Sequence, residues 1–156
     1  MTNHSTPRNR GISKVIKTLL FIFTIAFILY NSLQNGVDSS EASGSFTQWI
    51  QSILVFLGSN IIVQEGFIRT LAHFMEYALL GILAGLNILE YRNPRISKHF
   101  ILIVSLVPFF DEIMQSITPG RAFQMIDLMV DYLGIVLGLY VVYLGQKIRL
   151  NQRVKR

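Results

Sequence analysis

The chain has 156 residues, 51% of them hydrophobic, and its formal net charge is +5. This length suits a single domain, and the absence of cysteine excludes disulfides and thiolate metal sites. The apolar residues lie in blocks of about twenty with no polar face, which indicates membrane spans rather than a soluble helical core. We find no glycine-rich nucleotide-binding loop. The sequence therefore predicts an all-α, polytopic membrane protein.

The first apolar block covers residues 15–33 and follows a polar, basic segment at residues 1–14. A secretory signal peptide also begins with a basic stretch and an apolar run. This block is long for such a run, and no small-residue cleavage site follows it closely. We therefore predict a first membrane-spanning helix at residues 15–33, preceded by a disordered segment that ends near Ser13.

A shorter patterned segment lies at residues 46–57. Its apolar residues recur at helical spacing and leave a polar face opposite: Phe46, Trp49, Ile50, Ile53, Leu54 and Leu57. Ser45 followed by Gln48 fits a capping box, and Gly58 is a suitable helix end. At about twelve residues the segment is too short to cross a bilayer, so we predict an amphipathic helix in the membrane interface. It would serve as a surface anchor or as a lid.

Three further apolar blocks complete a bundle of four spans. They are predicted at residues 71–89, 100–117 and 123–144. A short basic link at residues 90–98 contains an Asn-Pro turn, and residues 146–156 form a basic polar tail. The four-helix membrane domain is thus expected to cover residues 15–145.

The basic residues predict how the bundle is oriented. All but two of the 14 Lys and Arg residues lie in the N-terminal segment, the link after the second span, or the C-terminal tail. Only Arg69 and Arg121 lie in the other two connections, between the first and second spans and between the third and fourth. Because Lys and Arg are enriched in cytoplasmic loops, we expect both termini to be cytoplasmic. We also expect anionic lipid, rather than nucleic acid, to be the partner of these charges.

Polar side chains interrupt the last three apolar blocks at a similar depth. The second block carries His73, Glu76 and Tyr77, the third Asp111, Glu112 and Gln115, and the fourth Asp127 and Asp131, with Arg121 in the turn before it. At 1.5 Å of rise per residue, all lie within about two turns of the exterior face. A carboxylate at mid-membrane costs about 2.5–3.5 kcal/mol. We therefore expect these groups to face inward and to meet in one pocket that opens to the exterior.

Glycines continue the acidic face of the fourth span toward the cytoplasm. Asp127, Asp131, Gly134, Gly138 and Gly145 fall within a narrow arc of one helix. Small residues spaced in this way let helix backbones approach closely in lipid. The second span has the same four-residue spacing between Gly81 and Gly85. We expect the glycines to pack the inner half of the bundle while the outer half opens around the polar groups.

Two stretches resemble the signatures of the VanZ-like membrane protein family. They are RTLAHFMEYALLGILAGL, beginning at Arg69, and DEIMQSITPGRAFQMIDLMVDYLGIVLG, beginning at Asp111. One departure is Thr70, where relatives often carry Lys. The resemblance implies a multi-pass protein of the bacterial plasma membrane that belongs to the cell envelope. The family's namesake is associated with teicoplanin resistance, and no established biochemical activity comes with the resemblance.

The first functional hypothesis is a pocket that binds or acts on a lipid-linked or amphiphilic envelope molecule, such as a lipoglycopeptide. Its candidate catalytic residues are His73, Glu76, Asp111, Glu112 and Asp131, and its candidate substrate-binding residues are Tyr77, Gln115, Arg121 and Asp127. A carboxylate would act as general base with the histidine, and the arginine would hold an anionic headgroup. No cofactor is predicted, although a divalent cation could be held by Glu76, Asp111, Glu112 and Asp131.

Two other functions fit the same residues. Acids and histidine form proton relays in cation-coupled transporters, although the apolar inner half offers no polar path. An accessory protein with no site chemistry is the other alternative. In that case His73 and Glu76 would share a hydrogen bond and Asp127 would stabilise a helix N-terminus. Arg121 would be either an interfacial anchor or a counter-ion to the acids.

Overall fold

The computed structural model describes residues 7–154, of which residues 7–10, 38 and 42 are described in their backbone alone. The described chain contains five helices and no strand. The helices are α1 (Pro7–Ser32), α2 (Gly36–Phe56), α3 (Glu65–Tyr91), α4 (Pro94–Ile117) and α5 (Met125–Val154). All except α2 contain a stretch long and apolar enough to cross a membrane. The predicted all-α bundle of four spans is confirmed.

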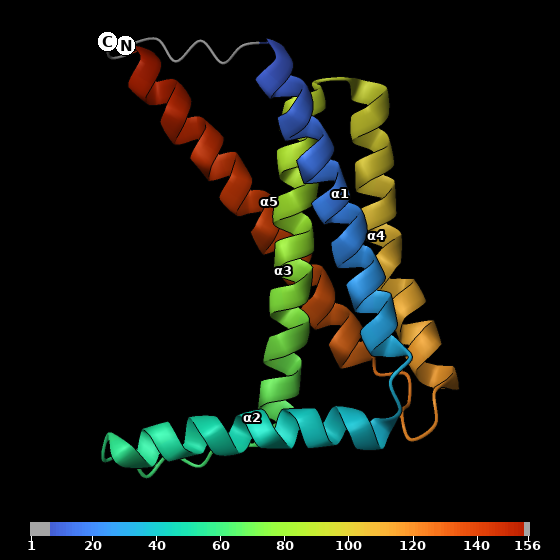
Figure 1. Cartoon of the computed structure of the whole chain (residues 1–156), viewed down its shortest axis with the longest axis vertical. Coiled ribbons are helices and arrows are strands. Elements are labelled where there is room, and N and C mark those ends of the chain that lie inside the picture. The colour runs from blue at the N-terminus through green and yellow to red at the C-terminus, as the bar shows by residue number, and fades with distance from the viewer. Residues whose placement is uncertain (1–6, 155–156) are drawn as a thin grey trace.

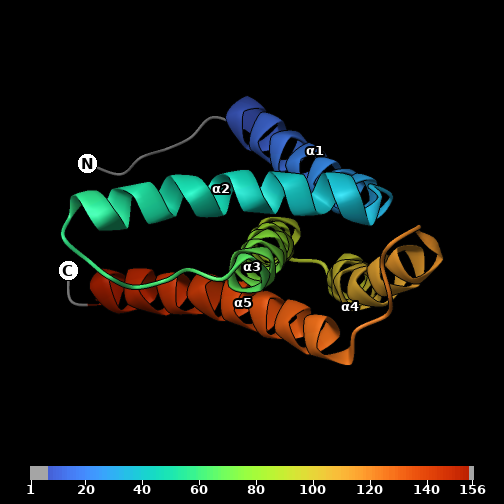
Figure 2. The same cartoon turned by 90° about the horizontal axis from the view of Figure 1, so that it is seen from below.

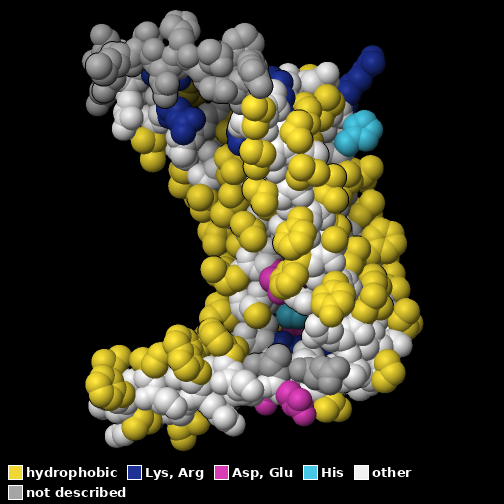
Figure 3. All heavy atoms as spheres, viewed as in Figure 1, with side chains coloured by type: hydrophobic (Ala, Val, Ile, Leu, Met, Phe, Trp, Pro, Cys, Tyr) yellow, Lys and Arg dark blue, Asp and Glu magenta, His cyan; other side chains and the backbone are white. Residues whose placement is uncertain are grey.

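The four spans form a bundle that α2 closes at one end. Helices α1, α3 and α4 run side by side, while α5 crosses α3 obliquely and diverges from it toward its own C-terminal end (Figure 1). Helix α2 lies crosswise to the bundle (Figures 1 and 2). The start of α1 and the end of α5 lie at the opposite end. The outer surface of the spans is covered by hydrophobic side chains (Figure 3), as expected of helices that face lipid.

The largest helix–helix contact is between α3 and α5, and glycines make it possible. A Cβ atom added at Gly138 would lie 2.2 Å from the carbonyl oxygen of Ala78, and one added at Gly81 would lie 2.4 Å from that of Ile135. The predicted packing role of these glycines is confirmed. Gly145 is an exception, since nothing lies within 4 Å of a Cβ there. By that point α5 has diverged from α3 (Figure 1).

Polar contacts and an aromatic pair hold α1 against the bundle near its N-terminal half. The ring of Phe21 meets that of Phe100 edge to face, with 5.1 Å between centroids. The fully buried Asn87 side chain accepts a hydrogen bond from Thr18 at 2.9 Å and donates one to the Lys17 carbonyl oxygen at 3.1 Å. These contacts fix α1 beside α3, because a buried amide must find partners within the protein.

The terminal helices are longer than predicted. The predicted spans lie within the observed helices apart from a residue or two at an end, but α1 begins at Pro7 and α5 continues to Val154. The expectation of disorder up to Ser13 is therefore wrong for residues 7–13, and residues 1–6 lie outside the described chain. Proline is favoured at the first helical position. The predicted tail is helical to Val154, because Gln, Lys, Arg and Leu are good helix formers and no Gly or Pro interrupts them.

Helix α2 also begins earlier than predicted. It starts at Gly36, so the capping box expected at Ser45 is not its start. The hydroxyls of Ser43 and Thr47 donate to carbonyl oxygens four residues back, at 2.9 and 2.7 Å. These bonds satisfy the polar side chains within the helix and allow the polar segment to be helical. The helix ends as predicted just before Gly58, whose φ of 78° favours glycine.

The glycine contact gives a matched pair of variants. Gly138→Ala places a methyl group against the backbone of α3 and should destabilise the protein by about 1–3 kcal/mol. Gly145→Ala on the same helix meets nothing and should have little effect. The measurement is the apparent melting temperature of the purified protein in detergent, followed by tryptophan fluorescence. Equal melting temperatures for the two variants would contradict the α3–α5 packing.

Candidate functional site

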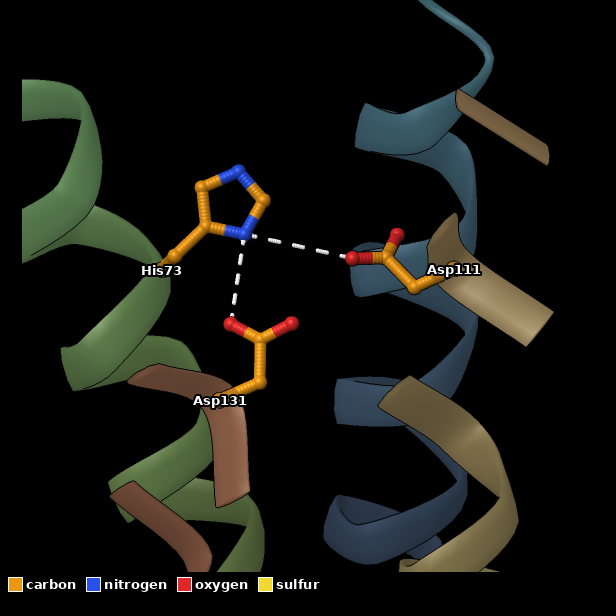
Figure 4. Close-up of side chains that lie close together, drawn as sticks. All are labelled: His73, Asp111 and Asp131. Carbon is orange, nitrogen blue, oxygen red and sulfur yellow. Dashed lines mark ion pairs between the residues drawn. The ribbon is translucent and has the colours of Figure 1, made fainter. Parts of the chain in front are cut away.

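Three of the four spans bring one side chain each to a common point. Nδ1 of His73 on α3 lies 3.5 Å from an Asp131 oxygen on α5 and 3.9 Å from an Asp111 oxygen on α4 (Figure 4). The side chains are 12%, 0% and 1% exposed, respectively. One potential ligand atom from each residue lies within 4.8 Å of those from the other two. The predicted convergence of intramembrane acids is thus observed for these residues, which we call the His–Asp cluster.

Asp111 is held in place by partners on two helices. Gln115 lies one turn further along the same face of α4 and donates a hydrogen bond to Asp111 at 3.0 Å. The Ser32 hydroxyl at the end of α1 donates to the other carboxylate oxygen and also lies 2.8 Å from the carbonyl oxygen of Ile28. Charge-assisted bonds of this kind orient a carboxylate strongly. Asp111 is therefore a fixed member of the cluster.

Other members of the site have no hydrogen-bond partner within the described chain. They include both carboxylate oxygens of Asp131, Nδ1 of His73 and the hydroxyl of Tyr77, which is fully buried. Buried polar groups in native proteins are nearly always paired. The site thus retains hydrogen-bonding and ligand-binding capacity that the protein itself does not use.

The His–Asp cluster borders a cavity of about 200 Å³ that lies between α2 and the adjoining parts of α1, α3 and α4. The cavity has both acidic and basic side chains in its wall. Its lining consists of Ile28, Asn31, Ser32, Gln34, Ser39, Ser43, Arg69, Ala72, His73, Glu76, Asp111, Gln115 and Arg121. Figure 3 shows histidine, basic and acidic side chains in an opening just above α2, surrounded by hydrophobic ones. A polar site with this mixture of charges can hold a ligand that carries both acceptors and donors.

Arg121 connects the turn between α4 and α5 to two other helices. Its guanidinium donates to the carbonyl oxygen of Asn31 at 3.2 Å and to the hydroxyl of Ser39 at 2.9 Å. Burial lowers the pKa of this group, and the nearby charge of Arg69 lowers it further. Within the described residues Arg121 forms no ion pair with an acid. Its observed contacts are thus those of an anchor at the mouth of the cavity, with its charge left available to a ligand.

Glu76 lies in the cavity wall but is not paired with His73. Its carboxylate accepts a hydrogen bond from the Asn31 side chain at 3.0 Å, whereas the histidine faces the two aspartates. The alternative of a mutual hydrogen bond between His73 and Glu76 is therefore not observed.

Two predicted site residues serve the start of α5 instead of the cavity. Glu112 accepts a hydrogen bond from the backbone N–H of Gln124 at 2.8 Å. Asp127 is buried in the first turn of α5, where a carboxylate stabilises the helix N-terminus. Neither lines the cavity. Of the four predicted cation ligands, Asp111 and Asp131 come together with His73, and Glu76 and Glu112 lie outside that group.

Several polar residues of the cavity were not among the predicted site residues. Asn31 and Ser32 lie at the end of the first apolar block, and Ser39 and Ser43 lie before the amphipathic helix predicted at residues 46–57. Polar residues at the end of an apolar block, or shortly after it, are only a weak sequence signal of a site. Arg69 begins one of the two quoted stretches, and it is the residue that could have been recognised from the sequence. It shares the cavity wall with Arg121.

The chain has four apolar spans, and three of them each contribute a side chain to a buried cluster of two acids and a histidine. These features define a multi-pass membrane protein with an intramembrane polar site. Residues 17–146 match the sequence profile of the VanZ/LLP1 family, and the chain belongs to that family. The resemblance in the two signature stretches is confirmed. Neither a curated protein nor a solved structure matches the chain.

The role of Arg121 can be tested by removing its charge. Arg121→Gln would leave the Asn31 carbonyl and the Ser39 hydroxyl without their donor and should destabilise the junction of α1, α2 and the α4–α5 turn by about 1–3 kcal/mol. Arg95→Gln is the matched control, since Arg95 is exposed at the other end of the bundle. Melting temperatures in detergent compare the two. An Arg121 variant as stable as the control would show that these bonds contribute nothing.

Proposed function

We propose that this protein binds, and acts on, the polar headgroup of a lipid-linked or amphiphilic molecule of the bacterial cell envelope. The observation that carries the proposal is the cavity near the α2 end of the bundle, whose wall combines two arginines with His73, Glu76 and Asp111. Arg69 and Arg121 would hold the anionic part of the headgroup, because guanidinium groups bind phosphate and carboxylate strongly.

The distribution of basic residues supports an exterior-facing cavity. Among the described residues, Arg69 and Arg121 are the only Lys or Arg residues at the α2 end, and the other described basic residues lie toward the opposite end of the bundle. By the positive-inside rule, both termini would be cytoplasmic in a bacterial plasma membrane. The cavity would then receive ligands from the outer leaflet, where lipid-linked envelope molecules are used.

The surroundings of the cavity suit a molecule with a long apolar chain. The exposed aromatic residues of α2, among them Phe46 and Trp49, would place that helix at headgroup level. An entirely apolar groove of about 310 Å³ runs between α1 and α4 and includes Leu29, Phe110 and Met114. A ligand could keep its chain in lipid along this groove while its headgroup occupies the cavity.

The His–Asp cluster would supply the chemistry. Both carboxylates face Nδ1 of the ring, and an imidazole with a carboxylate at Nδ1 is a common arrangement for general acid–base catalysis, since the carboxylate fixes the ring and stabilises its charged form. His73 would transfer the proton and Asp111 and Asp131 would orient the ring. The association of the family's namesake with teicoplanin resistance supports an effect of this chemistry on glycopeptide susceptibility.

Susceptibility measurements test the proposal. In a teicoplanin-susceptible bacterial host, expression of the wild-type protein should raise the inhibitory concentration of teicoplanin. His73→Gln and Asp131→Asn should return it to the value of the empty vector, because each removes a member of the cluster. Glu65→Gln is the control, because Glu65 is an exposed acid in the first turn of α3.

Membrane abundance must be measured in parallel by immunoblotting. Loss of resistance at normal abundance is the expected result. Full resistance in both cluster variants, or no resistance from the wild type, would contradict the proposed function. Loss of abundance that accounts for the loss of resistance would favour the purely structural alternative.

A further inference from the structure

We propose that His73, Asp111 and Asp131 form a binding site for one divalent transition-metal ion, with Zn²⁺ and Mn²⁺ as the ions that fit. This inference deepens the proposed function, and it rests on that function for the role of the ion in headgroup chemistry. The predicted set of cation ligands contained no histidine. The structure assigns a different set, in which His73 replaces Glu76 and Glu112.

The spacing of the three side chains suits a shared ion. Ligand atoms about 2.0–2.2 Å from one ion lie roughly 3.4 Å from each other in a tetrahedral arrangement. Nδ1 of His73 lies 3.5 Å from Asp131 and 3.9 Å from Asp111, and the whole set fits within 4.8 Å. Each ligand comes from a different span, so the bundle itself sets the distances. Only a small inward movement of the carboxylates would be needed.

The state of the Asp131 carboxylate points to a ligand independently of the spacing. The residue is fully buried, and neither carboxylate oxygen has a hydrogen-bond partner within the described chain. Figure 4 shows the carboxylate directed toward His73, on the side that also faces Asp111. Nδ1 of His73 lies 3.5 Å away as an ion-pair partner, but a buried carboxylate without a hydrogen bond is costly unless something else binds it. Asp111, in contrast, is oriented by Ser32 and Gln115, as carboxylate ligands of metals usually are by their neighbours.

Charge balance favours a divalent ion. Two carboxylates are buried together, and among the described residues no Lys or Arg forms an ion pair with either of them. Buried charges in proteins are paired or coordinate metals. A proton on His73 would compensate one negative charge, whereas a divalent ion bound to a neutral imidazole would compensate both.

The donor set and the adjoining cavity indicate which ions fit and what they would do. Mg²⁺ and Ca²⁺ prefer oxygen ligands alone, whereas imidazole nitrogen with carboxylates suits Zn²⁺ and Mn²⁺. His73 and Asp111 also line the cavity. An ion with three protein ligands would therefore keep coordination positions that face the cavity, which is typical of catalytic rather than structural sites. There it would polarise a headgroup oxygen, and with the ion bound His73 would serve as a ligand instead of transferring the proton.

Metal binding can be measured on the purified full-length protein, prepared with an affinity tag that contains no histidine. After EDTA treatment and buffer exchange, ZnCl₂ and MnCl₂ are titrated separately, and bound metal is determined by plasma mass spectrometry after dialysis. We expect about one ion per chain and a rise in melting temperature with ion concentration, because a ligand of the folded state stabilises it. Asp131→Asn and His73→Gln should lose both effects.

Asp127→Asn is the matched control, because Asp127 lies one turn earlier on α5 and outside the cluster. It should bind the ion as the wild type does. Size-exclusion chromatography verifies that each variant is folded. If Asp131→Asn is unstable, Asp131→Glu takes its place; this variant keeps a carboxylate and should bind the ion more weakly than the wild type. A wild-type protein that binds neither ion, or an Asp131→Asn variant that binds one normally, would overturn the inference.

The outcome is separable from that of the proposed function. If the wild type binds no ion but the cluster variants still abolish teicoplanin resistance at normal abundance, the metal inference fails and the proposed function stands. If one ion binds and the variants lose it without any change in susceptibility, the metal site stands and the proposed function fails.

Discussion

The fold depends on one constraint, which is that a carboxylate within a membrane span cannot face lipid. Asp111 and Asp131 lie inside apolar helices, and each would cost about 2.5–3.5 kcal/mol at the centre of the bilayer if left unpaired. Both are almost completely buried, beside a histidine from a third span. The requirement to hide these groups from lipid fixes which faces of α3, α4 and α5 turn toward one another.

Close packing of two helix backbones at glycine residues makes this arrangement of buried acids possible. Gly81, Gly134 and Gly138 let α3 and α5 approach until backbone meets backbone. Close contact just beyond Asp131 sets the distance across the His–Asp cluster. Toward its C-terminal end α5 leaves the bundle, and at the other end α2 covers a cavity. One pair of crossing helices thus produces both a tightly packed middle and an open polar end.

The sequence was sufficient to predict the features that follow from local pattern. The four spans, the common level of Asp111 and Asp131 along the bundle and the glycine arc all depend on hydropathy or helical period, and the structure agrees with them except at Gly145, which lies beyond the contact with α3. The same reasoning could show that Glu112 faces a different side of α4 from Asp111. It could not show that this side meets the backbone N–H of Gln124 at the start of α5.

Features that depend on contacts between distant segments could not be predicted. Ser32 and Asn31 reach the site only because α1 ends beside α3 and α4. The early start of α2 depends partly on the hydrogen bond from the Gly36 N–H to the carbonyl oxygen of Pro119 at 3.0 Å, in a turn far along the chain. A Ser-rich segment has weak helical preference of its own. The sequence pattern therefore predicts no helix for these residues and gives no reason to include them in the candidate site.

The central claim is that His73 and Asp131, from separate spans, interact directly, and a double-mutant cycle measures this interaction. Melting temperatures are determined for the wild type, His73→Gln, Asp131→Asn and the double variant. We expect a coupling energy of about 0.5–3 kcal/mol, because the stability effects of substitutions at two residues in contact are not additive. A parallel cycle between His73→Gln and Glu90→Gln, at the far end of α3, should be additive within about 0.5 kcal/mol. Additive effects in the first cycle would contradict the account.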